Sequence, residues 1–138
     1  KEILGVIPEY GNPRNPVDLT ATLDMNSFLK VPDLVLKQEE IDALITISLG
    51  ESLIKTMFPD VEEEDLKGIY EWINGELIDT YKKYAKPVII IEPSGSVSGG
   101  SATQLEDAGF PVYTTPERAA DVMGILWKRK QYLDKINN

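Results

Sequence analysis

Two runs of mostly apolar, β-branched residues constrain the fold of this chain more than any other feature. They are Ala43-Leu44-Ile45-Thr46-Ile47 and Val88-Ile89-Ile90-Ile91. Strands with one face in water alternate apolar and polar residues, whereas continuous apolar runs are typical of strands covered on both faces. The two runs therefore predict parallel strands buried between helices. Residues 17–19 and 111–113 are shorter strand candidates, and residues 3–7 form either an edge strand or the tail of a helix.

Helical patterns separate these strands. Residues 60–83 carry apolar positions at helical spacing, with acidic residues 62–65 at the start and lysines at the end, as the helix dipole favours. We interpret the acidic group as a solvated helix start. Further signals predict two capping boxes, a left-handed helix terminator and a capped final helix. The capping boxes are Asp60 with Glu63 and Ser101 with Gln104, the terminator is Gly109, and Thr115 followed by Pro116 caps the final helix.

The first helix has two alternative starts. Asp24 can cap a helix that has Pro32 in its interior, where proline removes a hydrogen bond and kinks the axis. Otherwise the helix starts later, with Pro32 in its first turn. Either way strands and helices alternate with short connections, which predicts right-handed parallel crossovers. We expect one α/β domain over residues 1–138, with an open parallel sheet of four to five strands flanked by helices. Residues 1–14 are a linker or an edge element.

Missing residue types exclude several function classes. The 138 residues include no His and no Cys. A Ser-His-Asp triad, thiol catalysis, a phosphohistidine and the usual zinc sites are therefore excluded. The net charge of −9 disfavours nucleic-acid binding, which needs a basic face. No stretch reaches the roughly 20 apolar residues of a membrane span, so we expect a cytoplasmic protein that contacts no membrane. We expect no catalytic residue and no metal in this chain.

Parallel sheets bind ligands beyond the carboxyl ends of their strands. Two loops at that edge, Thr20-Ala21-Thr22 and the Gly/Ser-rich loop ending in Ser98-Gly99-Gly100-Ser101, are candidate phosphate contacts at helix starts. The alternative is that their hydroxyls only satisfy nearby amides. Asp18 either faces a phosphate-bearing partner or accepts hydrogen bonds from amides of the next loop. We read Trp72 and Trp127 as core or interdomain contacts.

Two segments resemble a known family. They are Asn15-Pro16-Val17-Asp18-Leu19 with Glu40-Ile41-Asp42-Ala43-Leu44-Ile45, and Lys86-Pro87-Val88-Ile89 with Gly109-Phe110-Pro111-Val112-Tyr113 and Pro116-Glu117-Arg118-Ala119. They resemble the flavodoxin-like, succinyl-CoA synthetase-like ligase domain of NDP-forming acyl-CoA synthetases (ADP-forming acetate–CoA ligases) over roughly residues 12 to 130. The resemblance implies a three-layer flavodoxin-like domain belonging to a larger protein. Gly50, Glu51 and Ser52 then become additional phosphate-facing candidates.

The resemblance also implies the reaction of the whole enzyme. That reaction interconverts acyl-CoA, ADP and phosphate with free acid, CoA and ATP through a phosphohistidine. In such a protein this chain is a phosphate-cradling domain that is not active alone. ATP or ADP, Mg and CoA are expected on other domains or subunits, namely the CoA-binding, phosphohistidine and ATP-grasp domains. The acyl substrate depends on residues outside this chain.

Two other α/β classes remain as alternatives. A flavodoxin-like FMN-binding domain has a phosphate loop that Thr20-Ala21-Thr22 faintly matches, but the aromatic residues that stack on a flavin cannot be placed. A receiver-type signalling domain needs an acceptor Asp after its central strand, where this chain has Glu92-Pro93.

Overall fold

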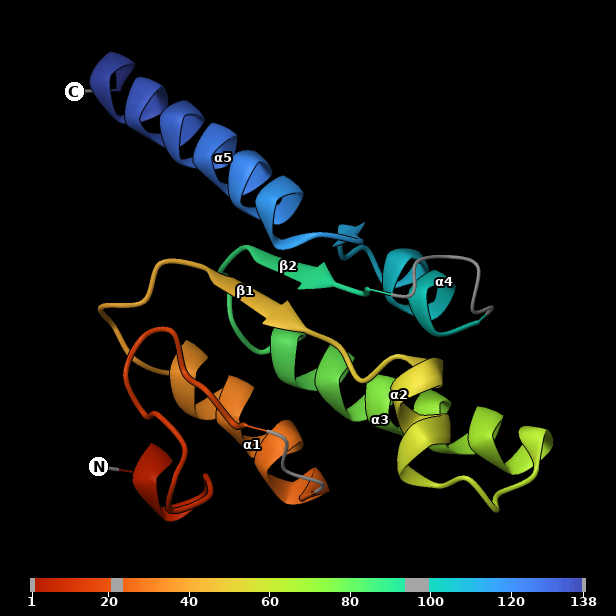
Figure 1. Cartoon of the computed structure of the whole chain (residues 1–138). Helices are drawn as coiled ribbons and strands as arrows, with labels where there is room; N and C mark the ends of the chain where they lie inside the picture. The colour runs from red at the N-terminus through yellow and green to blue at the C-terminus, as the bar shows by residue number, and fades with distance from the viewer. Residues whose placement is uncertain (1, 21–23, 94–99, 138) are drawn as a thin grey trace.

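The computed structural model describes residues 2–20, 24–93 and 100–137, without the side chains of residues 51–53 (Figure 1). Its strands and helices follow one another largely as the sequence predicts, with a further helix at Glu51–Met57 that the sequence did not indicate. They are η1 (Ile3–Gly5), α1 (Met25–Leu36), β1 (Leu44–Ile47), α2 (Glu51–Met57), α3 (Glu63–Lys82), β2 (Val88–Ile91), α4 (Gly100–Asp107), β3 (Val112–Tyr113) and α5 (Pro116–Ile136).

The sheet is parallel and open, as predicted, but it has three strands in the described residues and not four to five. The strand order is β1-β2-β3, with Leu44 opposite Val88 and Ile90 opposite Val112. Residues 17–19 do not join this sheet, because the backbone of Asp18 forms an isolated antiparallel bridge with Asn12. Residues 3–7, predicted as an edge strand or the tail of a helix, contain the short 3-10 helix η1 at Ile3–Gly5 and no strand.

Helices cover the two faces of the sheet unequally. α1, α3 and α4 lie on one face, where their apolar side chains and β1–β2 form the main core. On the other face α5 packs Ala119 against Ile89 and Ile91 of the fully buried strand β2. Beyond that contact α5 extends away from the sheet (Figure 1). The outer face of β1 is consequently open to solvent, with Ile45 39% and Ile47 58% exposed.

Side-chain caps decide where α1 and α5 begin. The carboxylate of Asp24 accepts hydrogen bonds from the amides of Asn26 and Ser27, so α1 begins early and Pro32 lies inside it. Thr115 caps α5 through the amide of Arg118, with Pro116 in the first turn, and Gly109 adopts a φ of 95° just after α4. Of the two alternative starts of α1, the early one at Asp24 is the one observed, and the predicted cap at Thr115 and left-handed terminator at Gly109 are confirmed.

Neither predicted capping box forms. Glu62, not Asp60, is the N-cap of α3, and its side chain makes no cap hydrogen bond. Asp60 lies too early in the chain to cap the helix, because residues 58–61 form a turn in which the amide of Val61 donates to the carbonyl of Phe58. Ser101 lies inside α4, which begins at Gly100. The acidic residues 62–65 are exposed, in agreement with a solvated helix start. Trp72 and Trp127 are 54% and 51% exposed, so neither belongs to the core.

Candidate functional site

A buried carboxylate marks the carboxyl edge of the sheet. Glu92 follows the central strand β2, is 1% exposed, and donates its backbone amide to the carbonyl of Tyr113 at 2.8 Å. Ser48 follows β1, and its Oγ donates to Oε2 of Glu92 at 2.5 Å. The two side chains thus join the ends of neighbouring strands through a charge-assisted hydrogen bond, which is stronger than a neutral one.

Gly50 allows this carboxylate to lie against the start of α2. It is the N-cap of α2, and a Cβ built on it would lie 2.1 Å from Oε1 of Glu92. The backbone of Gly50, with φ −63°, is open to any residue, so the requirement for glycine is steric. A negative charge at a helix start is favourable. Glu92 and Ser48 were not among the predicted site residues; the available signal was a charged residue directly after an entirely apolar strand.

Residues 18–20 form a tight turn with a strained residue. Oδ1 of Asp18 accepts the amide of Thr20 at 2.7 Å, which is the second of the two alternatives for Asp18, a bond to an amide just beyond it. Thr20 has a φ of 54°, and its hydroxyl donates to the carbonyl of Leu19 at 2.7 Å. A β-branched residue in the left-handed region is a genuine outlier, and such strain concentrates at functional sites.

The start of α4 is held from beneath by α3. Nδ2 of Asn74, which is 1% exposed, donates to the backbone oxygen and the Oγ of Ser101 at 3.2 and 3.1 Å. A Cβ on Gly100 would lie 2.9 Å from the hydroxyl of Tyr70, so α4 approaches α3 closely at this point. The hydroxyl of Ser101 is therefore buried against α3, in a structural contact that the sequence did not indicate.

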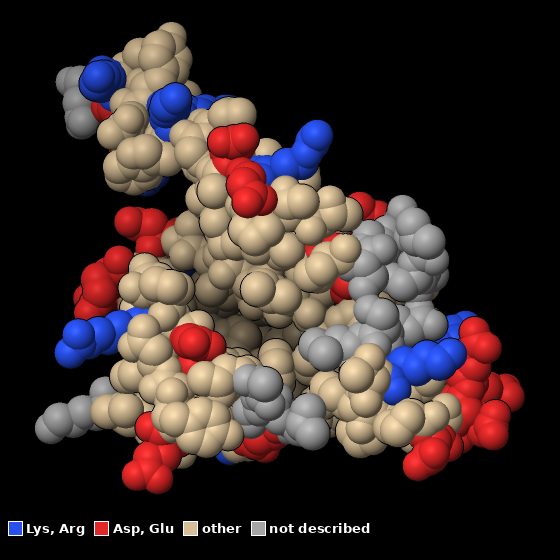
Figure 2. Space-filling model, in the orientation of Figure 1, with Lys and Arg blue, Asp and Glu red and all other residues tan. Residues whose placement is uncertain are grey.

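A cleft of about 790 Å³ lies between residues 15–20 and β1. Figure 2 shows this face hollowed, with mostly uncharged residues around the hollow and an acidic side chain close to its lower left. Asp18, Thr20 and Ser48 line it together, although β1 lies more than twenty residues from the turn. Gly50 is linked to this group through the Ser48–Glu92 pair, whereas Gly100 and Ser101 lie against α3 and do not line the cleft.

Several predicted site residues have no described position or side chain. Ala21, Thr22, Ser98 and Gly99 lie outside the described residues. Glu51 and Ser52 lie in the first turn of α2, and their side chains are not described. The phosphate-facing role of all these residues stays a prediction.

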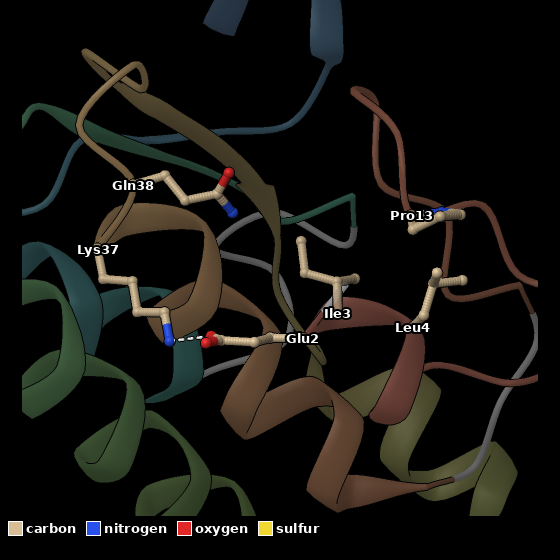
Figure 3. Close-up of a pocket in the computed structure, with 6 residues that line it drawn as sticks. All are labelled: Glu2, Ile3, Leu4, Pro13, Lys37 and Gln38. Carbon is tan, nitrogen blue, oxygen red and sulfur yellow. Dashed lines mark hydrogen bonds and ion pairs between the residues drawn. The ribbon is translucent and has the colours of Figure 1, made fainter.

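A second cavity of about 630 Å³ lies beside η1 and the end of α1 (Figure 3). Its lining cation, Lys37, forms an ion pair with Glu2, as the dashed line in Figure 3 shows. Hydrogen bonding to Lys37 lowers the pKa of this exposed carboxyl. The remaining lining is Ile3, Leu4, Pro13 and Gln38. A neutralised pair among apolar residues at this end makes a poor anion site, so the sheet edge is the better candidate.

The described lining of the cleft is uncharged apart from one carboxylate. Asp18 is its carboxylate, and no described lining residue is Lys or Arg. Burial raises the pKa of Tyr81 to about 12, although a hydrogen bond with Thr46 acts in the opposite direction. A phenol with this pKa stays protonated at neutral pH and is a poor acid or base. Binding at this edge would therefore rely on backbone amides and hydroxyls.

Two ADP-forming ligases are similar to this chain. The 4-hydroxybutyrate–CoA ligase of Nitrosopumilus maritimus is 27% identical over 126 residues, which are 91% of this chain and 16% of that protein. The alpha subunit of the ADP-forming acetate–CoA ligase II of Pyrococcus furiosus is 26% identical over 120 residues, which are 87% and 24% of the two chains. This chain thus spans a quarter or less of either relative. No family model and no solved structure matches it. Among the described residues, no helix has the length and apolar character to cross a membrane.

Proposed function

We propose that this chain, which is related to the NDP-forming acyl-CoA synthetases, supplies phosphate-facing loops to a ligase of that kind. The relatives act, by name, on acetate or 4-hydroxybutyrate with CoA and form ADP. In our proposal the carboxyl edge of the sheet meets a phosphohistidine carried by another domain or subunit. ATP or ADP, Mg and CoA bind elsewhere in that assembly.

The observation that carries this proposal is the turn at residues 18–20. Its strained Thr20 lines the same cleft as Ser48 at the end of β1, at the edge where parallel sheets bind ligands. The carboxylate of Asp18 fixes the amide of Thr20, which pre-organises the turn at residues 18–20. The strain is consistent with a backbone held ready for a ligand.

The receiver alternative fits the geometry less well. A phosphoacceptor carboxylate has to be reached by a phosphodonor, whereas Glu92 is 1% exposed and already bonded to Ser48. Nor do the comparisons point to signalling, because both relatives are ligases.

Amide chemical shifts test the proposal directly. The ¹⁵N-labelled chain is titrated with inorganic phosphate and with phosphoimidazole, which mimics a phosphohistidine side chain. We expect the amides of Thr20 and Gly50 to shift together, and phosphoimidazole to bind more tightly than phosphate. D18A removes the acceptor that fixes the amide of Thr20, so the turn at residues 18–20 is no longer pre-organised and binding should weaken by about tenfold.

K128A is the matched control. Residues 124–138 carry four Lys or Arg and one Asp, a charge of +3, while the whole chain carries −9. If K128A weakens binding as much as D18A, or if the shifts are confined to α5, phosphate binds the basic helix and the proposal is wrong.

We expect the chain alone to make no acyl-CoA from acetate or 4-hydroxybutyrate with ATP, Mg and CoA. The expected product is measured by liquid chromatography against authentic acyl-CoA. Turnover by the purified chain would overturn its role as one part of a ligase.

A further inference from the structure

We propose that the cleft between residues 15–20 and β1 is a docking site for an extended, apolar strand of another polypeptide segment. The strand would lie between the two walls and hydrogen-bond to both, so that the sheet continues across the gap. This inference does not depend on phosphate binding.

The free edge of β1 is one wall. β1 lies at the end of the strand order, with β2 on its other side. The amides of Leu44 and Ser48 donate to β2 and its flank, at the carbonyls of Pro87 and Ile91, so the even-numbered residues face β2. Backbone groups alternate in direction along a strand, which points those of Ile45 and Ile47 away from β2.

The backbone of residues 17–19 is the opposite wall. Asp18 exchanges both backbone hydrogen bonds with Asn12, each at 2.9 Å. The backbone groups of its neighbours Val17 and Leu19 then point to the other side of the segment, by the same alternation. Residues 15–20 and 43–49 line one cleft, so two strand edges border the same space.

The floor of the cleft is core material. Leu77 and Tyr81 from α3 and Phe28 from α1 line it, and these side chains belong to the main core or pack against it. On the outer side Ile45 and Ile47 remain 39% and 58% exposed, and Pro116 and Met123 of α5 line the cleft with them. Apolar surface of this kind is normally covered. An inserted strand would have apolar neighbours on both faces, so its residues should be continuously apolar and β-branched, not alternating.

Charge indicates the same kind of occupant. In a chain of net charge −9, the described lining of the cleft has Asp18 as its carboxylate and no cation. A neutral strand fits such walls, and basic residues at its ends complement the acidic protein. Strand addition in proteins has this division of roles: main-chain bonds provide affinity and side-chain pockets provide selectivity.

Amide hydrogen exchange tests the docking site on the intact chain. The probe is a capped heptapeptide, five alternating Val and Ile residues between terminal Lys residues. Saturating peptide should slow the exchange of Ile45 and Ile47 on one wall and of Val17 and Leu19 on the other, each by tenfold or more. Methylation of alternate peptide nitrogens along one edge should abolish this protection.

Four outcomes would overturn the proposal. The amides of Ile45 and Ile47 could be protected without peptide, which would mean that residues 16–20 close onto β1 by themselves. If that protection without peptide disappeared when the protein was diluted, the occupant of the cleft would instead be a second copy of this chain. Protection confined to one wall or to α5 would exclude insertion. The absence of any effect at millimolar peptide would also exclude it.

Two variants at Ile47 separate the backbone bond from the side chain. I47P removes the amide that faces the free edge, and proline is tolerated on edge strands. I47T removes most of the apolar side chain but keeps the amide. We expect I47P to lose at least tenfold in peptide affinity and I47T less than threefold, as one lost hydrogen bond implies. Equal losses would contradict strand pairing. If circular dichroism shows that I47P is unfolded, the N-methylated peptide makes the same comparison.

Discussion

Replacing Gly50 by alanine places a methyl carbon where the carboxylate of Glu92 now lies. The added Cβ would be 2.1 Å from Oε1 and 2.5 Å from Oε2, closer than real Cβ contacts. Glu92 follows a central strand and is 1% exposed, so its carboxylate cannot move without leaving Ser48. The loss of a hydrogen bond to a charged group costs about 1.5–3 kcal/mol. The φ of −63° adds no backbone strain for alanine. We therefore expect G50A to lower the free energy of unfolding by about 2 kcal/mol.

A double-mutant cycle shows whether Glu92 is the cause. Urea denaturation of the wild type, G50A, E92A and G50A/E92A gives the four free energies. Once the carboxylate is absent, the methyl group has room, and the substitution at residue 50 should cost less than about 1 kcal/mol, which is the poorer capping by alanine at the N-cap of α2. The reasoning is refuted if G50A costs the same with and without Glu92, or if G50A is as stable as the wild type.

Three further predictions concern single side chains. T20G should raise the free energy of unfolding by about 0.5 kcal/mol, because glycine relieves the left-handed strain at φ 54° but loses more chain entropy on folding. T20A keeps a Cβ and should give no gain, and thermal melts of the two variants and the wild type test the difference. D24A removes the cap of α1 and should cost about 1 kcal/mol at pH 7. Hydrogen bonding from Ser27 lowers the pKa of Asp24 in the folded protein. The stabilisation by the cap is therefore present above the ordinary carboxyl pKa and is lost as the pH falls through the lowered pKa of the folded state. Denaturation at pH 7 and pH 3 should show that the difference in unfolding free energy between D24A and the wild type shrinks at the lower pH. Burial raises the pKa of Tyr81 to about 12. The protonated hydroxyl therefore contributes its full stabilisation below the ordinary tyrosine pKa near 10, and this stabilisation is lost as the pH rises through 12. Between pH 9 and 12 the free energy of unfolding should fall more steeply for the wild type than for Y81F, and parallel curves would contradict the assignment.

Local signals predicted the parts of the structure that depend on neighbours in the chain. The cap at Thr115, the left-handed Gly109 and the buried run of β2 were all readable from short segments. Their physics involves a few adjacent residues and a period of burial. The two capping boxes are the exception. Ser101 lies inside α4 because α3 provides Asn74 as the partner of its hydroxyl, a competitor that no local pattern contains.

The candidate site was only half readable. Location at the carboxyl edge follows from the parallel order of the strands, and residues 18–20 were predicted there. The Ser48–Glu92 hydrogen bond and the contact of Glu92 with Gly50 were not, since they join residues 44 and 42 positions apart. Sequence separation hides such pairs, because only the register of β1 against β2 brings their ends together.

By itself, then, the sequence determined the alternation of helices and strands, the parallel sheet and the resemblance to a ligase domain. Only the tertiary structure decided that residues 17–19 bond to Asn12 and not to β1, and that α5 leaves Ile45 and Ile47 uncovered. The reason is physical: an apolar run specifies that a strand will be buried, but not which neighbour will bury it.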